Sequence, residues 1–178
     1  ILPMMQVDEH TKDAFGHRLN GDAASEAMIV QVCAAQAPTS FTLYEDDGLK
    51  LQYESDGRPK YHHRTTEIGQ QQVDADTVRV RIENAVEVNG TAPFDGAANS
   101  RHNLVRLIVE EMKATSVTLN GMPLVEQASE AALQAAVSGW LNAGRNLILA
   151  KSPKLGVGAA KEFAFELQPV TPLTSVNF

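Results

Sequence analysis

The feature of this chain that most constrains its fold is a period of two in its apolar residues. Short segments in which every second side chain is apolar recur along the sequence, most clearly at residues 41–43, 78–82, 105–109 and 163–167. Successive side chains of a β-strand point to opposite faces of its sheet, so this alternation is typical of strands with one buried face. The sequence therefore predicts a fold made mainly of half-buried strands.

Turn-forming residues separate the predicted strands. Asn120-Gly121 stands between the strand-like segments 117–119 and 122–125. Asn-Gly is the strongest short-range signal for a type I′ hairpin, because both central residues need positive φ. Pro123 cannot donate a ladder hydrogen bond, so it marks an exposed edge position. This segment is predicted to be a hairpin at a sheet edge.

A second hairpin is predicted between residues 41–44 and 49–53, with Glu45-Asp46-Asp47-Gly48 as its turn. Many short strands joined by regular turns are typical of a sandwich. We therefore expect an all-β fold, an antiparallel β-sandwich.

One segment departs from the strand pattern. Residues 129–138 contain good helix formers, with Ser129 as a candidate N-cap and Gly139 as a candidate terminator. One short helix is predicted near residues 129–138.

Composition limits the classes of partner. The chain has 22 acidic and 15 basic residues, for a formal net charge of −7, and no basic stripe that could follow a phosphate backbone. No apolar run approaches the roughly 20 residues that a membrane-spanning helix needs. We therefore expect neither a nucleic-acid partner nor a membrane span. The lone Cys33 cannot form an internal disulfide, so a soluble protein could be cytoplasmic or secreted.

The densest polar cluster is Glu45-Asp46-Asp47. Two interpretations remain open for it. The carboxylates could belong to a solvated turn in which Asp side chains bond their own backbone. They could also bind calcium, a hard cation that takes roughly six to eight oxygen ligands. A glycosidase pair is not expected, because nothing on an exposed turn would hold two neighbouring carboxyl groups in different protonation states.

Aromatic side chains are few, and four of them are candidates for stacking on sugar rings: Tyr44, Tyr53, Tyr61 and Trp140. Core packing is the alternative for Trp140. The sequence contains no nucleophile elbow, glycine-rich phosphate loop or spaced set of zinc ligands. No catalytic residue is predicted.

The run Phe41-Thr42-Leu43-Tyr44-Glu45-Asp46-Asp47-Gly48, followed by Tyr53-Glu54, Gly57, Tyr61 and Arg64-Thr65-Thr66-Glu67-Ile68, resembles the segment after the catalytic barrel in glycoside hydrolase family 31. That family contains α-glucosidases, α-xylosidases and related α-glucosyltransferases. The opening Ile1-Leu2-Pro3 is similar to the end of the family's proximal C-terminal domain, and 117–121 to a late hairpin of its distal domain.

The resemblance implies a domain organisation. Residues 1–22 would be the tail of the proximal C-terminal domain and a linker, and residues 23–178 the distal C-terminal β-sandwich. The chain begins without methionine and is expected to continue a longer polypeptide. The family's catalytic aspartates lie on a (β/α)₈ barrel that would precede residue 1, and no segment here is similar to the stretch around the family nucleophile.

The resemblance also implies a function. The chain would be a non-catalytic accessory domain that packs on the barrel and the proximal domain of a retaining α-glycosidase and stabilises them. The alternative is a carbohydrate-binding module for α-glucan oligosaccharides that uses the four aromatic residues. No cofactor would be required, although calcium at Glu45, Asp46 and Asp47 could stabilise the domain.

Overall fold

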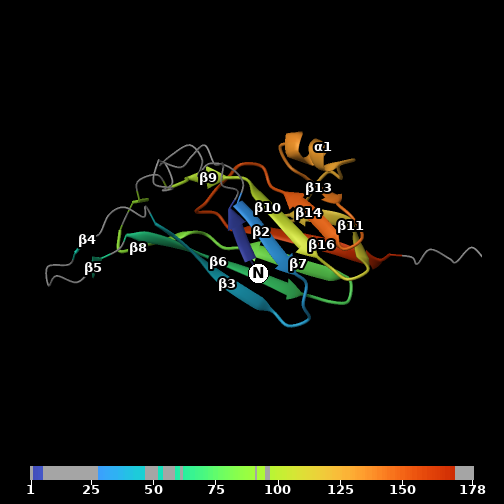
Figure 1. Ribbon diagram of the computed structural model, residues 1–178, viewed down its shortest axis with the longest axis horizontal. Helices are drawn as coiled ribbons and strands as arrows, with labels where there is room; N and C mark the ends of the chain where they lie inside the picture. Colours follow the sequence, from blue (N-terminus) through green and yellow to red (C-terminus); the bar gives the residue numbers. More distant parts are fainter. Residues whose placement is uncertain are drawn as a thin grey trace, which may run out of the picture.

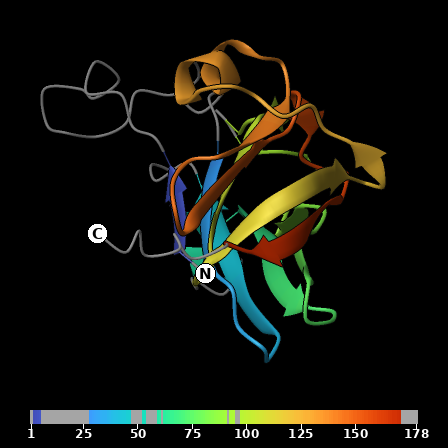
Figure 2. The ribbon, with the colours of Figure 1, turned by 90° about the vertical axis from the view of Figure 1, so that its right-hand side faces the viewer.

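The structure is a computed structural model in which residues 2–5, 28–46, 52–53, 59–60, 62–90, 92–94 and 97–170 are described. Two β-sheets lie face to face, with one short helix beside them (Figures 1 and 2). The predicted all-β sandwich is confirmed. Its only described helix has six residues, and no helix in the described part of the chain is long and apolar enough to cross a bilayer.

The first sheet has five strands and therefore four pairs of neighbouring strands. β2 and β10 run parallel, whereas the other neighbours pair antiparallel. The strands in spatial order are β1 (Leu2–Met5), β2 (Met28–Cys33), β10 (Asn103–Ile108), β14 (Leu147–Lys151) and β13 (Gly139–Asn142).

The second sheet has seven strands and is antiparallel throughout its described ladders. Its path is β12 (Met122–Pro123), β11 (Met112–Leu119), β16 (Lys161–Pro169), β7 (Thr77–Ile82), β6 (His63–Gln72) and β3 (Thr39–Asp46), and β8 (Val86–Val88) also pairs with β6. Two small ladders join β9 (Ser100–Arg101) to β15 (Leu155–Gly156) and β4 (Gln52–Tyr53) to β5 (Pro59–Lys60).

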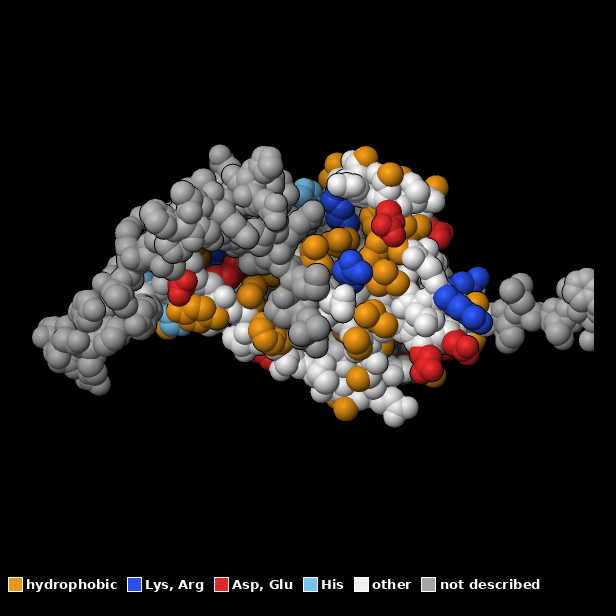
Figure 3. Space-filling view, in the orientation of Figure 1, with side chains coloured by type: hydrophobic (Ala, Val, Ile, Leu, Met, Phe, Trp, Pro, Cys, Tyr) orange, Lys and Arg blue, Asp and Glu red, His pale blue; other side chains and the backbone are white. Residues whose placement is uncertain are grey.

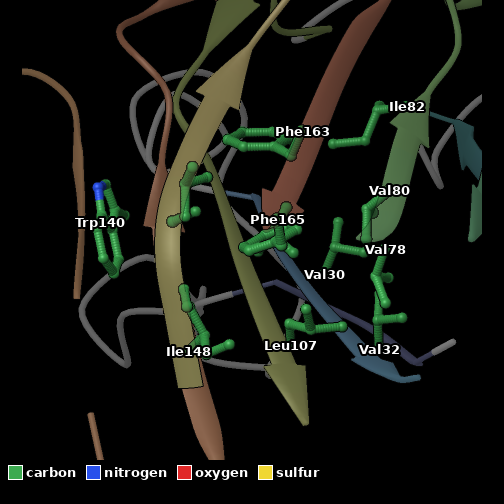
Figure 4. Packing of buried hydrophobic residues seen from close by; sticks show 14 of the residues in the cluster. Val30, Val32, Val78, Val80, Ile82, Leu107, Trp140, Ile148, Phe163 and Phe165 are labelled. Atoms are coloured by element: carbon green, nitrogen blue, oxygen red, sulfur yellow. The ribbon is translucent and has the colours of Figure 1, made fainter. Parts of the chain in front are cut away.

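The core lies between the sheets and consists of the alternate residues that the period of two marks (Figure 4). Phe163 and Phe165 of the second sheet are fully buried and lie among aliphatic side chains of both sheets. The other labelled core residues are Val30, Val32, Val78, Val80, Ile82, Leu107, Trp140 and Ile148. Removing such surface from water is the main favourable contribution to folding. Phe41 departs from the prediction, since 39% of it remains exposed on the edge strand β3.

The Asn120-Gly121 hairpin is confirmed. Its residues have φ values of 50° and 78°, as a type I′ turn requires. The hairpin joins β11 to β12, with Thr118 opposite Pro123. β12 ends the described path of the sheet, which agrees with the edge position expected from Pro123.

The predicted hairpin between 41–44 and 49–53 is wrong. β3 continues through Glu45 and Asp46 and pairs with β6 along its whole length, and the described part of 49–53, β4, pairs with β5. The ten residues of β6 supply a partner for every one of the eight residues of β3. That longer ladder satisfies more backbone groups than a hairpin of four-residue arms.

The predicted helix is confirmed as α1 (Glu130–Ala135). The hydroxyl of Ser129 accepts a hydrogen bond from the Ala132 amide at 3.1 Å, which is the N-cap interaction that was expected. Its C-cap is Ala136 in an extended conformation. Gly139 instead begins β13, so its predicted role as the terminator is wrong.

Strand β1 comes from the segment that the sequence assigns to a preceding domain. It forms the edge of the five-stranded sheet, with Leu2 opposite Gln31 and Met5 opposite Met28. The boundary at residue 22 falls outside the described residues and stays a prediction.

Candidate functional site

A group of buried charged residues occupies one end of the sandwich, and we call it the polar end. It begins with Glu45, which shares the inward face of β3 with Leu43 because the two are two positions apart. Arg101 on β9 is 3% exposed and donates to both Glu45 carboxylate oxygens, at 2.8 and 2.7 Å. Bidentate pairs of this kind are among the strongest hydrogen-bonded contacts in proteins. This pair ties the β9 segment to the edge strand β3.

A second ion pair lies beside the first, because Arg64 is the residue opposite Glu45 in the β3–β6 ladder. Arg64 is 1% exposed, and its Nε donates to Glu87 Oε1 at 2.7 Å. Its Nη1 donates to the Ala98 carbonyl oxygen at 2.8 Å, and its guanidinium carbon lies 5.5 Å from the centre of the Phe94 ring. Arg64 therefore holds the segment before β9 against the second sheet.

Lys161 completes the polar end. It lies on the inward face of β16, two and four positions before Phe163 and Phe165, and it is 2% exposed. Burial and, to a smaller extent, the positive charge of Arg101 together lower the pKa of its ammonium to about 8. No acidic side chain of the described residues forms an ion pair with Lys161. The polar end thus holds three buried cationic side chains and two carboxylates.

The proposed calcium ligands are placed differently from one another. Both oxygens of Glu45 accept hydrogen bonds from Arg101, Asp46 ends β3 opposite His63, and Asp47 lies outside the described residues. Within the described ranges, no group of three or more His, Cys, Asp or Glu side chains could hold a metal ion. Glu45 is a strand residue and not part of a solvated turn, and the calcium site stays a prediction.

The proposed stacking residues are also dispersed. Tyr44 is 50% exposed on β3 and stacks on His63, with ring centres 4.6 Å apart. Tyr53 lies in β4, of which only the backbone is described, and Tyr61 lies outside the described residues. Trp140 is 4% exposed and donates from Nε1 to the Leu124 carbonyl oxygen at 3.2 Å. Its ring therefore has the packing role that was the alternative, and Tyr44 is the described residue that offers a surface for stacking.

The outer face of the seven-stranded sheet carries a hollow of about 500 Å³, which we call the outer-face hollow. Gly69 on β6 lies between Ser40 of β3 and Arg81 of β7 in the ladder. Because Gly69 has no side chain, an opening is left among the polar side chains of three adjacent strands. The wall of the hollow includes Pro38, Thr39, Ser40, Glu67, Gln71, Arg79, Arg81, Glu83 and Glu162.

Charged side chains elsewhere are scattered. On the face in Figure 3, Lys and Arg lie in separate small groups among acidic and apolar side chains. This face of the described residues offers no continuous basic surface.

The buried positions of Arg64, Arg101 and Lys161 were not predicted from the sequence. The period of two could have indicated a buried Lys161, because Lys161 lies on the same face of its strand as Phe163 and Phe165. Arg64 likewise lies on the same buried face of β6 as Ile68. Long basic side chains are rarely buried without a partner, so residue type alone argues against buried positions for these three.

No protein-family model matches the chain, and no curated protein matches it either. Solved structures do match. Two are structures of the uncharacterized protein lmo2446 from Listeria monocytogenes EGD-e, one of them in complex with α-D-glucose, β-D-glucose, magnesium and calcium. A third is a cycloalternan-forming enzyme from Listeria monocytogenes in complex with a pentasaccharide substrate.

Each match has a TM-score of 0.52 and 16% sequence identity and covers 93% of this chain. The chain spans only 13% of the length of each of those proteins. The fold of this chain thus recurs as a small part of longer chains, one of which is described as an enzyme with an oligosaccharide substrate. At this identity the likeness concerns the fold alone.

Proposed function

We propose that this chain is the distal C-terminal accessory domain of a family 31 α-glucosidase-like hydrolase or transglucosidase. Residues 1–22 would be the tail of the proximal C-terminal domain and its linker, with β1 of this tail adding an edge strand to the sandwich of residues 23–178. The observation that carries the proposal is that two independent signals agree. The family-like run at residues 41–48 predicts a domain that follows a catalytic barrel, and the fold matches a small segment of an enzyme that forms a sugar product.

The polar end supports a structural role more than a catalytic one. A retaining glycosidase needs one carboxylate as nucleophile and one protonated carboxyl group as acid, about 5 to 5.5 Å apart and facing a cleft. The two carboxylates of the polar end each accept hydrogen bonds from an arginine. Carboxylates that are engaged by arginines in this way serve to fix neighbouring segments in place. The chemistry would then belong to the barrel of the parent enzyme, against which this domain would pack.

The purified chain is expected to be folded and catalytically inactive. Far-ultraviolet circular dichroism would report a β-rich spectrum, and incubation with p-nitrophenyl α-glucosides would release no p-nitrophenol above background. A fraction purified in the same way from cells without the gene is the matched control. Release by the folded chain at a rate well above that control would contradict the assignment as an accessory domain.

A second candidate function is a carbohydrate-binding module for α-glucan oligosaccharides. The observation that favours it is the half-exposed Tyr44 ring stacked on His63. Aromatic rings bury the apolar faces of sugars while polar groups nearby bond the hydroxyls. The two functions are compatible, since a domain that stabilises an enzyme can also hold its polymeric substrate.

A further inference from the structure

We propose that the outer-face hollow and the neighbouring Tyr44–His63 pair together form a binding site for a short, uncharged oligosaccharide. The inference rests on the second candidate function above and assigns it a place in the fold. Trp140, Tyr53 and Tyr61 are not needed for it.

Strand alternation places the components of this site on one surface. Ser40 and Tyr44 are four positions apart on β3, so both point away from the core. Gly69 and Thr65 lie opposite them on β6. Both are on the outward face of β6, as His63 is. The rise of about 3.3 Å per strand residue separates Ser40 from Tyr44 by about 13 Å. A ligand that contacts both the hollow and the Tyr44 ring must be longer than one sugar ring.

The wall of the hollow has the chemistry that recognises hydroxyl groups. Arg81 Nε lies 2.6 Å from Glu83 Oε1, and Arg79 Nε lies 3.9 Å from Glu162 Oε1. An arginine has five N–H donors and a carboxylate has about four acceptor sites, so each pair retains groups for a ligand. Sugar hydroxyls both donate and accept, and they suit such a mixed wall.

The charge of the hollow selects against ionic ligands. Its wall contains three glutamates and two arginines, so positive and negative charge nearly balance. A nucleotide or another polyanion would meet the glutamates, and a basic peptide would meet the arginines. The volume of about 500 Å³ falls in the range of roughly 300 to 1,000 Å³ typical of small-ligand pockets. An uncharged oligosaccharide of a few sugar units suits both the nearly balanced charge of the wall and the volume of the hollow.

Gly69 offers a direct test, because a side chain there would project into the hollow without disturbing the core. A Cβ built on Gly69 meets only the Thr39 carbonyl oxygen, at the ordinary contact distance of 3.7 Å. Gly69→Val therefore introduces a β-branched residue that strands favour at the centre of the site. Gly158→Val is the matched control: Gly158 is exposed, and a Cβ there has no atom within 4 Å.

The experiment is a titration of the full chain with maltooligosaccharides and isomaltooligosaccharides, followed by calorimetry and by amide shifts in nuclear magnetic resonance. We expect wild type and Gly158→Val to bind one of the series with equal, millimolar affinity. Gly69→Val should bind at least about tenfold more weakly, a loss of about 1.4 kcal/mol, with an unchanged thermal midpoint. Tyr44→Ala should also weaken binding, most for the longer sugars.

Two outcomes would overturn the proposal. One would contradict only the location of the site, and the other would also contradict the carbohydrate-binding function. If wild type binds and folded Gly69→Val binds equally well, the site is wrong although the chain still binds sugar. If wild type shows neither heat nor shifts with either series at tens of millimolar, the site and the carbohydrate-binding function both fail. The accessory-domain function would survive either result.

Discussion

Replacing Arg101 with alanine is expected to lower the free energy of unfolding by about 3 to 5 kcal/mol, the usual effect of removing one partner of a buried ion pair. Arg101 is 3% exposed and donates to both oxygens of Glu45, whose side chain is only 13% exposed. Without the guanidinium, the Glu45 carboxylate would be left in a site that water scarcely reaches. Urea denaturation of Arg101→Ala and wild type, followed by tryptophan fluorescence, measures the difference.

A matched control and a rescue make this result specific. Arg79→Ala removes an arginine whose side chain is 49% exposed and 3.9 Å from its partner, so it should change the unfolding free energy by less than about 1 kcal/mol. The double variant Glu45→Met/Arg101→Met removes both charges and should recover much of the stability lost in Arg101→Ala. If Arg101→Ala unfolds at the same urea concentration as Arg79→Ala, the ion pair does not hold the polar end together.

Replacing Lys161 with methionine is expected to stabilise the domain at neutral pH. Methionine keeps an unbranched side chain of similar length while removing a charge that burial and Arg101 both disfavour. Burial and the charge of Arg101 together lower the pKa of Lys161 from 10.5 to about 8. Since one pKa unit corresponds to about 1.4 kcal/mol, the gain at pH 7 should be up to about 3 kcal/mol.

The effect of Lys161 on stability should depend on pH in a defined direction. Between pH 8 and 10.5 the unfolded chain keeps a proton on Lys161 that the folded chain has released. The unfolded state then binds more protons, so the contribution of Lys161 to the unfolding free energy rises with pH across this window. Below pH 8 the ammonium is charged in both states and the full penalty remains. The advantage of Lys161→Met should therefore shrink as pH increases from 7 to 10.5.

Urea denaturation of wild type and Lys161→Met at pH 7, 8, 9 and 10 tests this directly. Other lysines and the tyrosines titrate in the same range, but they cancel in the difference between the two proteins. Lys113→Met is the matched control, because Lys113 is exposed on β11, and it should show little change at any pH. A Lys161→Met variant that is less stable than wild type at pH 7, or whose advantage does not vary with pH, would contradict the position given to Lys161.

Local patterns in the sequence were enough to predict much of the fold. The period of two identifies the inward side chains of β7 and β16, such as Val80 and Phe165, because alternation is a property of a single strand. Asn120-Gly121 and Ser129 likewise act on backbone groups within a few residues of themselves. Such features can be predicted from a single short segment of the sequence, because they depend only on residues close together in the chain.

Features that depend on two distant segments were harder to predict. The parallel pairing of β2 with β10 joins residues about 75 positions apart, and no local pattern states it. The pairing of β3 with β6 places Glu45 inside the sandwich, although the acidic run 45–47 suggested a turn. Arg101 is the partner that makes this burial possible, and it comes from a short strand with no periodicity of its own.

The outer-face hollow could not have been predicted from motifs. It depends on the absence of a side chain at Gly69 and on the register that sets Ser40 and Arg81 on either side of it. Glycine in a strand interior often marks the close approach of a ligand or backbone. That signal gains meaning only when the neighbouring strands are known.

Determining the DNA sequence upstream of the Ile1 codon and translating it in frame would test the proposal that this sandwich belongs to a larger α-glycosidase. We predict a long open reading frame that encodes a (β/α)₈ barrel with two candidate catalytic aspartates, followed by a small β-domain that ends at Ile1-Leu2-Pro3. A start codon or a signal peptide immediately before Ile1, with no barrel in the frame, would contradict the claim.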